Sequence, residues 1–412
     1  MTSLFRLSLI SLLFFSCENQ TEQPQPEAAT LQLKYVSVGS SFTAGFMNGG
    51  LYRESQLGSY PNLIAQQMKV NFTQPLFPTE QENGTGYMKA VWMLPTLTTQ
   101  SINEKIAIRS TNPILFTKFS GSINNLGIGN MRMKDVSTAG YGNPSKTDFN
   151  PHFERLLAAG QEDKNYLDFV KDTKPNLYTV MLGDDDIAQY ALSGGRKTVT
   201  DVMVFSQNTR LLLDALVSTQ AKGIVATLPD ILDFPYFNYY TLESLKGKNG
   251  LGSDIYITTN NGITRKATNK DFFTFDSFKR IESTAKTGLP DGQNANKPLT
   301  TEYVIDENEA NQIRFKINEF NGILKKEATE RQIPILDLNL VFQNLKDKKY
   351  GDGSINYSFP SGNLFSLDGY HPTAKGYAII ANEFIKSINE NYKNLIKTTI
   401  SSVDVAKFEG LK

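Results

Sequence analysis

Short apolar segments alternate with longer amphipathic segments along most of the chain. Short apolar runs are typical of strands that are buried on both faces of a parallel sheet. The pattern predicts five such strands, at Leu33–Val38, Ser122–Leu126, Leu177–Leu182, Ile224–Leu228 and Ile333–Leu338.

Helical periodicity occurs between these strands. The pattern predicts helices at Tyr60–Met68, Tyr166–Lys171, Thr200–Gln220, Asp306–Gln332 and Thr373–Asn389. In the fourth helix, Asp306 and Glu309 have the spacing of a capping box. Apolar residues of that helix recur on one face, at Ile313, Ile317, Phe320 and Leu324.

Alternating strands and helices predict an α/β fold, namely a doubly wound three-layer sandwich around a five-stranded parallel sheet of the flavodoxin-like kind. We expect one domain over residues 33–392, followed by a C-terminal tail at 393–412. Two stretches, about 71–121 and 233–303, exceed what the core needs and are predicted to be insertions. The aromatic run at 234–240 either packs the second insertion onto the core or forms a wall of a binding surface.

Residues that carry chemistry follow the predicted strands. Ser41 comes directly after the first strand, and Asp184–Asp186 after the third. Asp368 and His371 lie just before the last helix. Because open α/β sheets place their sites beyond the carboxyl ends of the strands, we expect all of them at one edge of the sheet.

The N-terminus has the pattern of a targeting segment rather than of a folded one. Residues 1–16 form a signal peptide with a short basic start and an apolar core, and Cys17 is the chain's only cysteine. Residues 17–32 are polar and rich in Pro and Gln, so we expect a flexible tether. The pattern predicts that Cys17 is lipidated and holds the protein at a membrane; the alternative is a cleaved signal with an incidental cysteine.

Charge excludes one class of partner. The 42 basic and 42 acidic residues give no net charge at pH 7, whereas a nucleic-acid surface needs a basic excess or patch. We therefore expect no nucleic-acid partner. The chain is 40% hydrophobic and 20% charged, which suits a globular protein with a sizeable core.

Two motifs together contain the parts of a Ser-His-Asp triad. The first is GSSFTAG at 39–45, a serine on a Gly-flanked turn, and the second is DGYHPT at 368–373. In such a triad Ser41 attacks, His371 accepts its proton and Asp368 orients the imidazole. The alternative for the second motif is a polar loop with a surface histidine.

These motifs resemble those of the GDSL/SGNH hydrolase superfamily, especially its large envelope-lipoprotein forms in Bacteroidota. The resemblance covers the scaffold from about residue 33 to residue 389, without the two insertions. The resemblance implies an oxyanion hole formed by Ser41, Gly129 or Asn130, and Asp185. The family's Asp before the nucleophile is Ser40 here, and an ungapped match puts Asn130 where the family has its donor glycine.

The third family block, Gly-x-Asn-Asp, reads GDDD at 183–186. Asp185 replaces an amide donor by a carboxylate, which donates to an oxyanion only when it is protonated. Three adjacent carboxylates can raise one pKa, so this rescue is available. The triplet's other interpretations are a divalent-cation site and a solvated turn that caps the next helix.

The resemblance implies a serine ester hydrolase that acts on lipid, glycan or small acyl esters and needs neither metal nor cofactor. The alternative is a catalytically degenerate lipoprotein that serves as a binding or scaffold subunit. In either case we expect an outer-membrane lipoprotein of the bacterial cell envelope, facing the periplasm or the surface. The resemblance also suggests an outer-membrane β-barrel as a partner.

Overall fold

A computed structural model describes residues 33–92, 97–247, 254–349 and 355–411 of the chain. The predicted signal peptide, Cys17 and the tether lie outside the described residues. Residues 33–412 form one compact unit. None of the helices in the four described ranges is long and apolar enough to cross a membrane.

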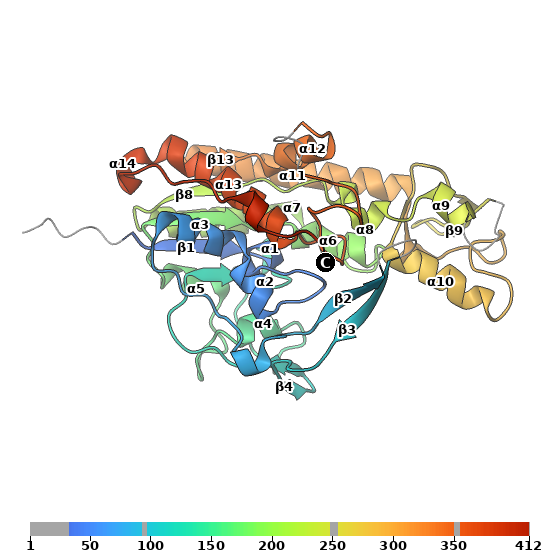
Figure 1. The fold of residues 1–412 in the computed structure, drawn as a ribbon, viewed down its shortest axis with the longest axis horizontal. Coiled ribbons are helices and arrows are strands. Elements are labelled where there is room, and N and C mark those ends of the chain that lie inside the picture. The colour runs from blue at the N-terminus through green and yellow to red at the C-terminus, as the bar shows by residue number, and fades with distance from the viewer. Residues whose placement is uncertain (1–32, 93–96, 248–253, 350–354, 412) are drawn as a thin grey trace, which may run out of the picture. The chain divides into compact units, whose positions relative to one another are not determined.

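The centre of this unit is a sheet of five parallel strands, in the order β13-β8-β7-β1-β6 (Figure 1). By position along the chain this order is 2-1-3-4-5, which is the flavodoxin-like order. The predicted fold class is therefore confirmed. The strands are β1 (Tyr35–Gly39), β6 (Asn125–Gly127), β7 (Leu177–Met181), β8 (Lys222–Ala226) and β13 (Ile335–Leu336).

Helices cover both faces of the sheet. On one face α3 (Tyr60–Met68) packs on α13 (Ala374–Asn391), and α7 (Val202–Val217) packs between α5 (Tyr166–Lys171) and α11 (Glu307–Glu330) on the other. All five helices correspond to predicted ones, within a few residues at each end.

The remaining helices of the described residues are α1 (Ser41–Ala44), α2 (Arg53–Leu57), α4 (Pro151–Glu154), α6 (Asp185–Leu192), α8 (Pro235–Asn238), α9 (Leu242–Gly247), α10 (Phe275–Ala285), α12 (Leu338–Lys346) and α14 (Lys393–Ile396). Short 3-10 turns lie at Thr79–Gln81, Met133–Asp135, Ile231–Asp233, Thr301–Tyr303 and Val405–Lys407.

Helix α11 forms as its sequence predicts. The Asp306 side chain accepts the Glu309 N–H at the N-terminus of the helix, and the Glu309 side chain accepts the Asp306 N–H, so the capping box is present. The predicted apolar face is buried, and Phe320 stacks on Phe205 of α7 with ring centroids 3.9 Å apart. This stack joins two helices on one face of the sheet.

The stretch at 71–121, which exceeds the core, carries two antiparallel hairpins. The first is β2 (Tyr87–Trp92) with β3 (Thr98–Ile102), and the second is β4 (Ile108–Thr111) with β5 (Ile114–Phe116). The buried Glu154 of α4 holds this segment through ion pairs of 2.6 Å with Arg109 and Lys118.

The stretch at 233–303 has its own small apolar cluster and pairs β9 (Tyr256–Thr258) with β10 (Thr264–Lys266). Another short pair is formed by β11 (Phe272–Phe273) and β12 (Val304–Ile305). In the aromatic run, Phe234 and Phe237 are buried in the main core, which agrees with the packing interpretation.

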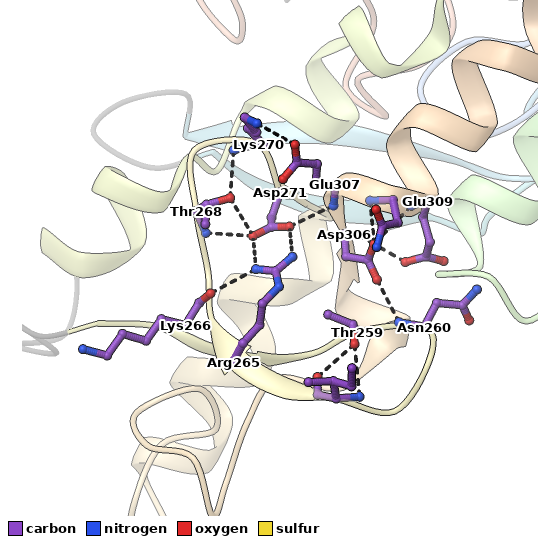
Figure 2. A network of polar contacts seen from close by, with 12 residues as sticks. Thr259, Asn260, Arg265, Lys266, Thr268, Lys270, Asp271, Asp306, Glu307 and Glu309 are labelled. Carbon is purple, nitrogen blue, oxygen red and sulfur yellow. Dashed lines mark hydrogen bonds and ion pairs between the residues drawn. The ribbon is translucent and has the colours of Figure 1, made fainter.

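A polar network fixes this second insertion to α11 (Figure 2). Arg265 of β10 makes two bonds of 2.7 Å to the Asp271 carboxylate, which also accepts the Glu307 N–H at 3.0 Å. Asp306 accepts the N–H of Asn260 at 2.8 Å. The hairpin β9–β10 is thus bound to the first turn of α11.

Candidate active site

Ser41 and Asp185 follow two neighbouring parallel strands, β1 and β7. These are the strands at which the sheet order reverses, and such switch points open a crevice at the carboxyl edge. Ser41 is the first residue of α1 and is buried. Two residues earlier the turn requires a glycine, Gly39, because a Cβ at that position would lie 2.1 Å from Thr43 Oγ1.

The Ser41 hydroxyl has two polar partners. It accepts the backbone N–H of Asn130 at 2.9 Å and donates to Asp185 Oδ2 at 3.3 Å. The loop after β6 and the start of α6 therefore converge on the candidate nucleophile. A backbone N–H that already points at this oxygen is the type of donor that forms an oxyanion hole.

The two residues that the sequence offered as oxyanion donors, Gly129 and Asn130, have different surroundings. Asn130 has a left-handed backbone (φ 60°), which asparagine adopts more readily than most residues, and its N–H points at Ser41. Gly129 instead provides close packing, because a Cβ there would lie 2.5 Å from the Phe46 ring. Asn150 holds the loop by donating to Gly129 O at 2.8 Å.

Asp368 and His371 form the second half of the site. Asp368 Oδ2 lies 2.8 Å from His371 Nδ1, and Oδ1 accepts the backbone N–H of His371 at 2.8 Å. Burial alone would raise the pKa of Asp368, but the imidazole and these backbone donors lower it below its usual value. The carboxylate stays ionised and fixes the ring so that Nε2 remains available.

The His371 ring lies against the residues that surround Ser41. Its centroid is 5.5 Å from that of Phe42, the next residue after Ser41, and 5.5 Å from that of Phe46. Within the described part of the chain, the Ser41 hydroxyl bonds to Asn130 and Asp185 rather than to this ring. The structure thus brings the predicted residues to one region, with the Ser41 hydroxyl turned toward Asn130 and Asp185.

The three aspartates at the start of α6 bond in three directions. Asp184 accepts the Ser40 hydroxyl at 2.5 Å, Asp185 accepts that of Ser41, and Asp186 accepts the N–H of Met133 at 2.5 Å. Such divergent carboxylates do not surround a single point. No group of three or more His, Cys, Asp or Glu residues in the described ranges is arranged to hold a metal ion.

Burial raises the pKa of all three carboxyls. The pKa of Asp186 is raised to about 7, chiefly by burial. The pKa of Asp185 is raised well above its usual value, first by burial and then by the charges of its two acidic neighbours. Protonated Asp185 is a hydroxyl donor, so burial opposes the repulsion that its ionised form would exert on an oxyanion.

Two features of the site have no sequence signal. Ser40 donates its hydroxyl to Asp184, although the two residues are 144 positions apart in the sequence. Position 40, where the family has an aspartate, thus carries a hydroxyl donor. His152, the chain's other histidine, is buried behind the Asn130 loop, where burial lowers its pKa to about 3. Only the fold shows that His152 supports the loop by packing.

The chain matches the GDSL-like lipase/acylhydrolase family over residues 35–384 and belongs to that family. The match includes both halves of the site, from the serine turn to the Asp-x-x-His loop. No curated protein sequence matches the chain.

Several solved structures resemble the chain at low identity. An acetyl xylan esterase, AlAXEase, is 14% identical, with 86% of this chain and 100% of that one covered and a TM-score of 0.35. An α/β hydrolase from the metagenome of Lake Arreo, Spain, is 11% identical over 86% and 94%, with a TM-score of 0.36. An acetyl esterase with an acetate ion is 12% identical over 89% and 98%, with a TM-score of 0.29.

Proposed function

We propose that the protein is a serine ester hydrolase in which Ser41 attacks, His371 transfers protons and Asp368 orients the ring. One observation carries the proposal: an imidazole bonded to a partly buried carboxylate packs on Phe42, the residue after a serine whose oxygen already contacts a backbone N–H donor. These are the geometric roles of a nucleophile, a base, its orienting group and an oxyanion donor.

The reaction has two halves. The Ser41 side chain turns from Asp185 to His371 and attacks the ester carbonyl while Nε2 takes its proton. The bond to the alcohol then breaks, and Nε2 returns the proton to the leaving oxygen. A water then attacks the acyl-serine while Nε2 takes its proton. The bond to Ser41 Oγ breaks and Nε2 returns that proton to Oγ, which releases the carboxylic acid and restores Ser41.

The oxyanion forms where three groups meet. The N–H of Ser41 belongs to the first turn of α1, where it has no partner within the helix, so we assign it as the first donor. The N–H of Asn130 is the second donor, and protonated Asp185 is the third. This hole works below the pKa of Asp185 and weakens above it, because the ionised carboxylate repels the developing charge.

A fluorophosphonate probe tests this function, because labelling requires both an activated serine and a working hole. We expect the wild-type protein to be labelled and to hydrolyse p-nitrophenyl acetate, and Ser41→Ala and His371→Ala to do neither. Ser283→Ala, at an exposed serine of α10, is the matched control and should behave as wild type. Equal labelling of wild type and Ser41→Ala would contradict the proposal.

One observation favours a second candidate, a catalytically degenerate binding or scaffold lipoprotein. The Ser41 hydroxyl donates to Asp185, a residue whose ionised form opposes the chemistry. If the folded wild-type protein is neither labelled nor active on any ester between pH 5 and 9, this candidate is favoured. An outer-membrane β-barrel is then the partner to seek by co-purification.

We also propose that lipid on Cys17 anchors the protein in the cell envelope, as an outer-membrane lipoprotein. The apolar run before Cys17 and the polar tether after it support this anchoring. Cys17→Ala should move the protein from the membrane fraction to the soluble one. Unchanged sedimentation of that variant with membranes would contradict lipid anchoring.

A further inference from the structure

A groove of about 630 Å³ begins at Asn130, the residue whose N–H contacts the candidate nucleophile. One wall is the segment at 141–151, and the other is the end of α6 with the loop that follows it, at 189–198. Its lining is largely polar and includes Tyr141, Asp148, Gln189, Arg196 and Lys197. An ester held at Ser41 would therefore have this groove beside it.

The charges in this groove do not balance. Arg132 is neutralised by Asp135, with Nε and Oδ2 2.7 Å apart. Arg196 donates from Nε to the carbonyl of Ser193, and neither Arg196 nor Lys197 has an ion pair among the described residues. With Asp148 as the remaining acidic group of the lining, two exposed cations face one carboxylate.

The loop that carries Arg196 and Lys197 packs closely against Thr301 and Glu309. Gly194 and Gly195 both have left-handed backbones (φ 59° and 77°), and a Cβ on Gly194 would lie 2.4 Å from Thr301 O. A Cβ on Gly195 would lie 2.8 Å from Glu309 Oε1, which also accepts the Tyr190 hydroxyl at 2.8 Å. Glu309 belongs to the first turn of α11, beside the network of Figure 2, so this loop is tied to a rigid element.

Two buried acidic groups of α6, Asp185 and Asp186, do not line the groove. Burial also raises the pKa of each. Their proton-bound forms carry no charge. The exposed cations of the loop at 196–197 therefore set the sign of the field that a substrate meets in the groove.

We propose that this groove binds an anionic group of the substrate, so that the enzyme prefers esters that carry a carboxylate. The inference rests on the proposed ester hydrolase function and specifies its substrate class. The carboxylate sits on either the acyl or the alcohol part of the ester, and both place it beside Arg196 and Lys197. Exposed charge pairs of this kind change binding by a few fold each.

Two matched pairs of esters distinguish the two sources of the carboxylate. Mono-p-nitrophenyl succinate is compared with p-nitrophenyl butyrate for the acyl side, and 4-acetoxybenzoate with phenyl acetate for the alcohol side. We expect kcat/KM to favour the anionic member of one pair by about three- to tenfold. The double variant Arg196→Gln/Lys197→Gln should remove this preference, and added salt should weaken it.

Lys222→Gln is the matched control, because Lys222 is exposed at the start of β8, at the opposite edge of the sheet. A preference that survives the double variant, or a preference for the neutral ester in both pairs, would overturn the inference. Hydrolysis of neutral esters would then still support the ester hydrolase.

To test the groove without turnover, the same esters are titrated calorimetrically into Ser41→Ala protein. Binding that is equal for anionic and neutral esters would again refute the inference.

Discussion

The substitution Asp185→Asn tests the oxyanion hole most directly. Asp185 Oδ2 lies 3.3 Å from Ser41 Oγ, and the proposed function makes this carboxyl the third donor to the oxyanion. An asparagine there donates at every pH, whereas the carboxyl donates only when it is protonated. The two proteins should therefore differ in a way that depends on pH.

The sign of this dependence follows from the raised pKa. Below the pKa of Asp185 the wild-type group is neutral and donates, so the variant should gain little. Above it the wild-type group is ionised, and the variant should be faster by about 10²-fold, which corresponds to about 3 kcal/mol of transition-state stabilisation. The ratio of the two kcat values should thus rise with pH and then level off.

The free energy of unfolding should also depend on the protonation of Asp185. The folded state raises the pKa of Asp185 above that of the unfolded chain, so the stabilising proton is bound in full at low pH and lost as pH rises through the folded pKa. Asp185→Asn removes this loss. The variant should therefore exceed the wild type in denaturant midpoint at neutral pH and lose that advantage toward pH 4.

The assay is turnover of p-nitrophenyl acetate from pH 5 to 9, with urea unfolding of the same samples. Ser41→Ala in the Asp185→Asn background should abolish any gain, which separates the hole from background hydrolysis. If the folded variant is no faster than the wild type at any of these pH values, the oxyanion does not form beside Asp185, and the reasoning fails.

Three further substitutions test other parts of the structure. Asp368→Asn should lower kcat by about 10³- to 10⁴-fold with little change in thermal stability, because it disturbs the tautomer and orientation of His371; an unchanged kcat would remove Asp368 from the triad. Gly129→Ala should destabilise the fold by about 1–3 kcal/mol in urea unfolding, because its Cβ meets the Phe46 ring at 2.5 Å. Phe320→Ala should cost about 3–5 kcal/mol by the same measurement, and a cost under 1 kcal/mol would show that the stack between α7 and α11 contributes little.

The core of the fold was predictable because its strands are buried on both faces and read as short apolar runs. Residues 177–181 show this well, since all five are buried and the predicted strand differs by one residue. Edge strands were less accurate: only Ile335 and Leu336 pair in β13, against six predicted residues. At a sheet edge the pairing depends on one neighbour, which sequence pattern does not specify.

The candidate site was predictable where local motifs carry it. The Asp368–His371 bond lies within one loop, so three residues of spacing are enough to suggest it. The choice between Gly129 and Asn130 stayed open, because it depends on which N–H the fold aims at Ser41. The unpaired cations at 196–197 were invisible as well, since only the fold shows which charges find partners.

The loop that carries His371 is joined to the serine turn across nearly the whole length of the chain. Asp368 accepts the N–H of Gly49, 319 positions away, and Tyr377 donates to Phe46 O across 331 positions. During synthesis, the proposed nucleophile Ser41 therefore emerges long before the proposed base His371 and before the residues that hold His371. We expect a nascent chain, or one truncated before α13, to have no esterase activity, so that catalysis begins only once α13 is in place.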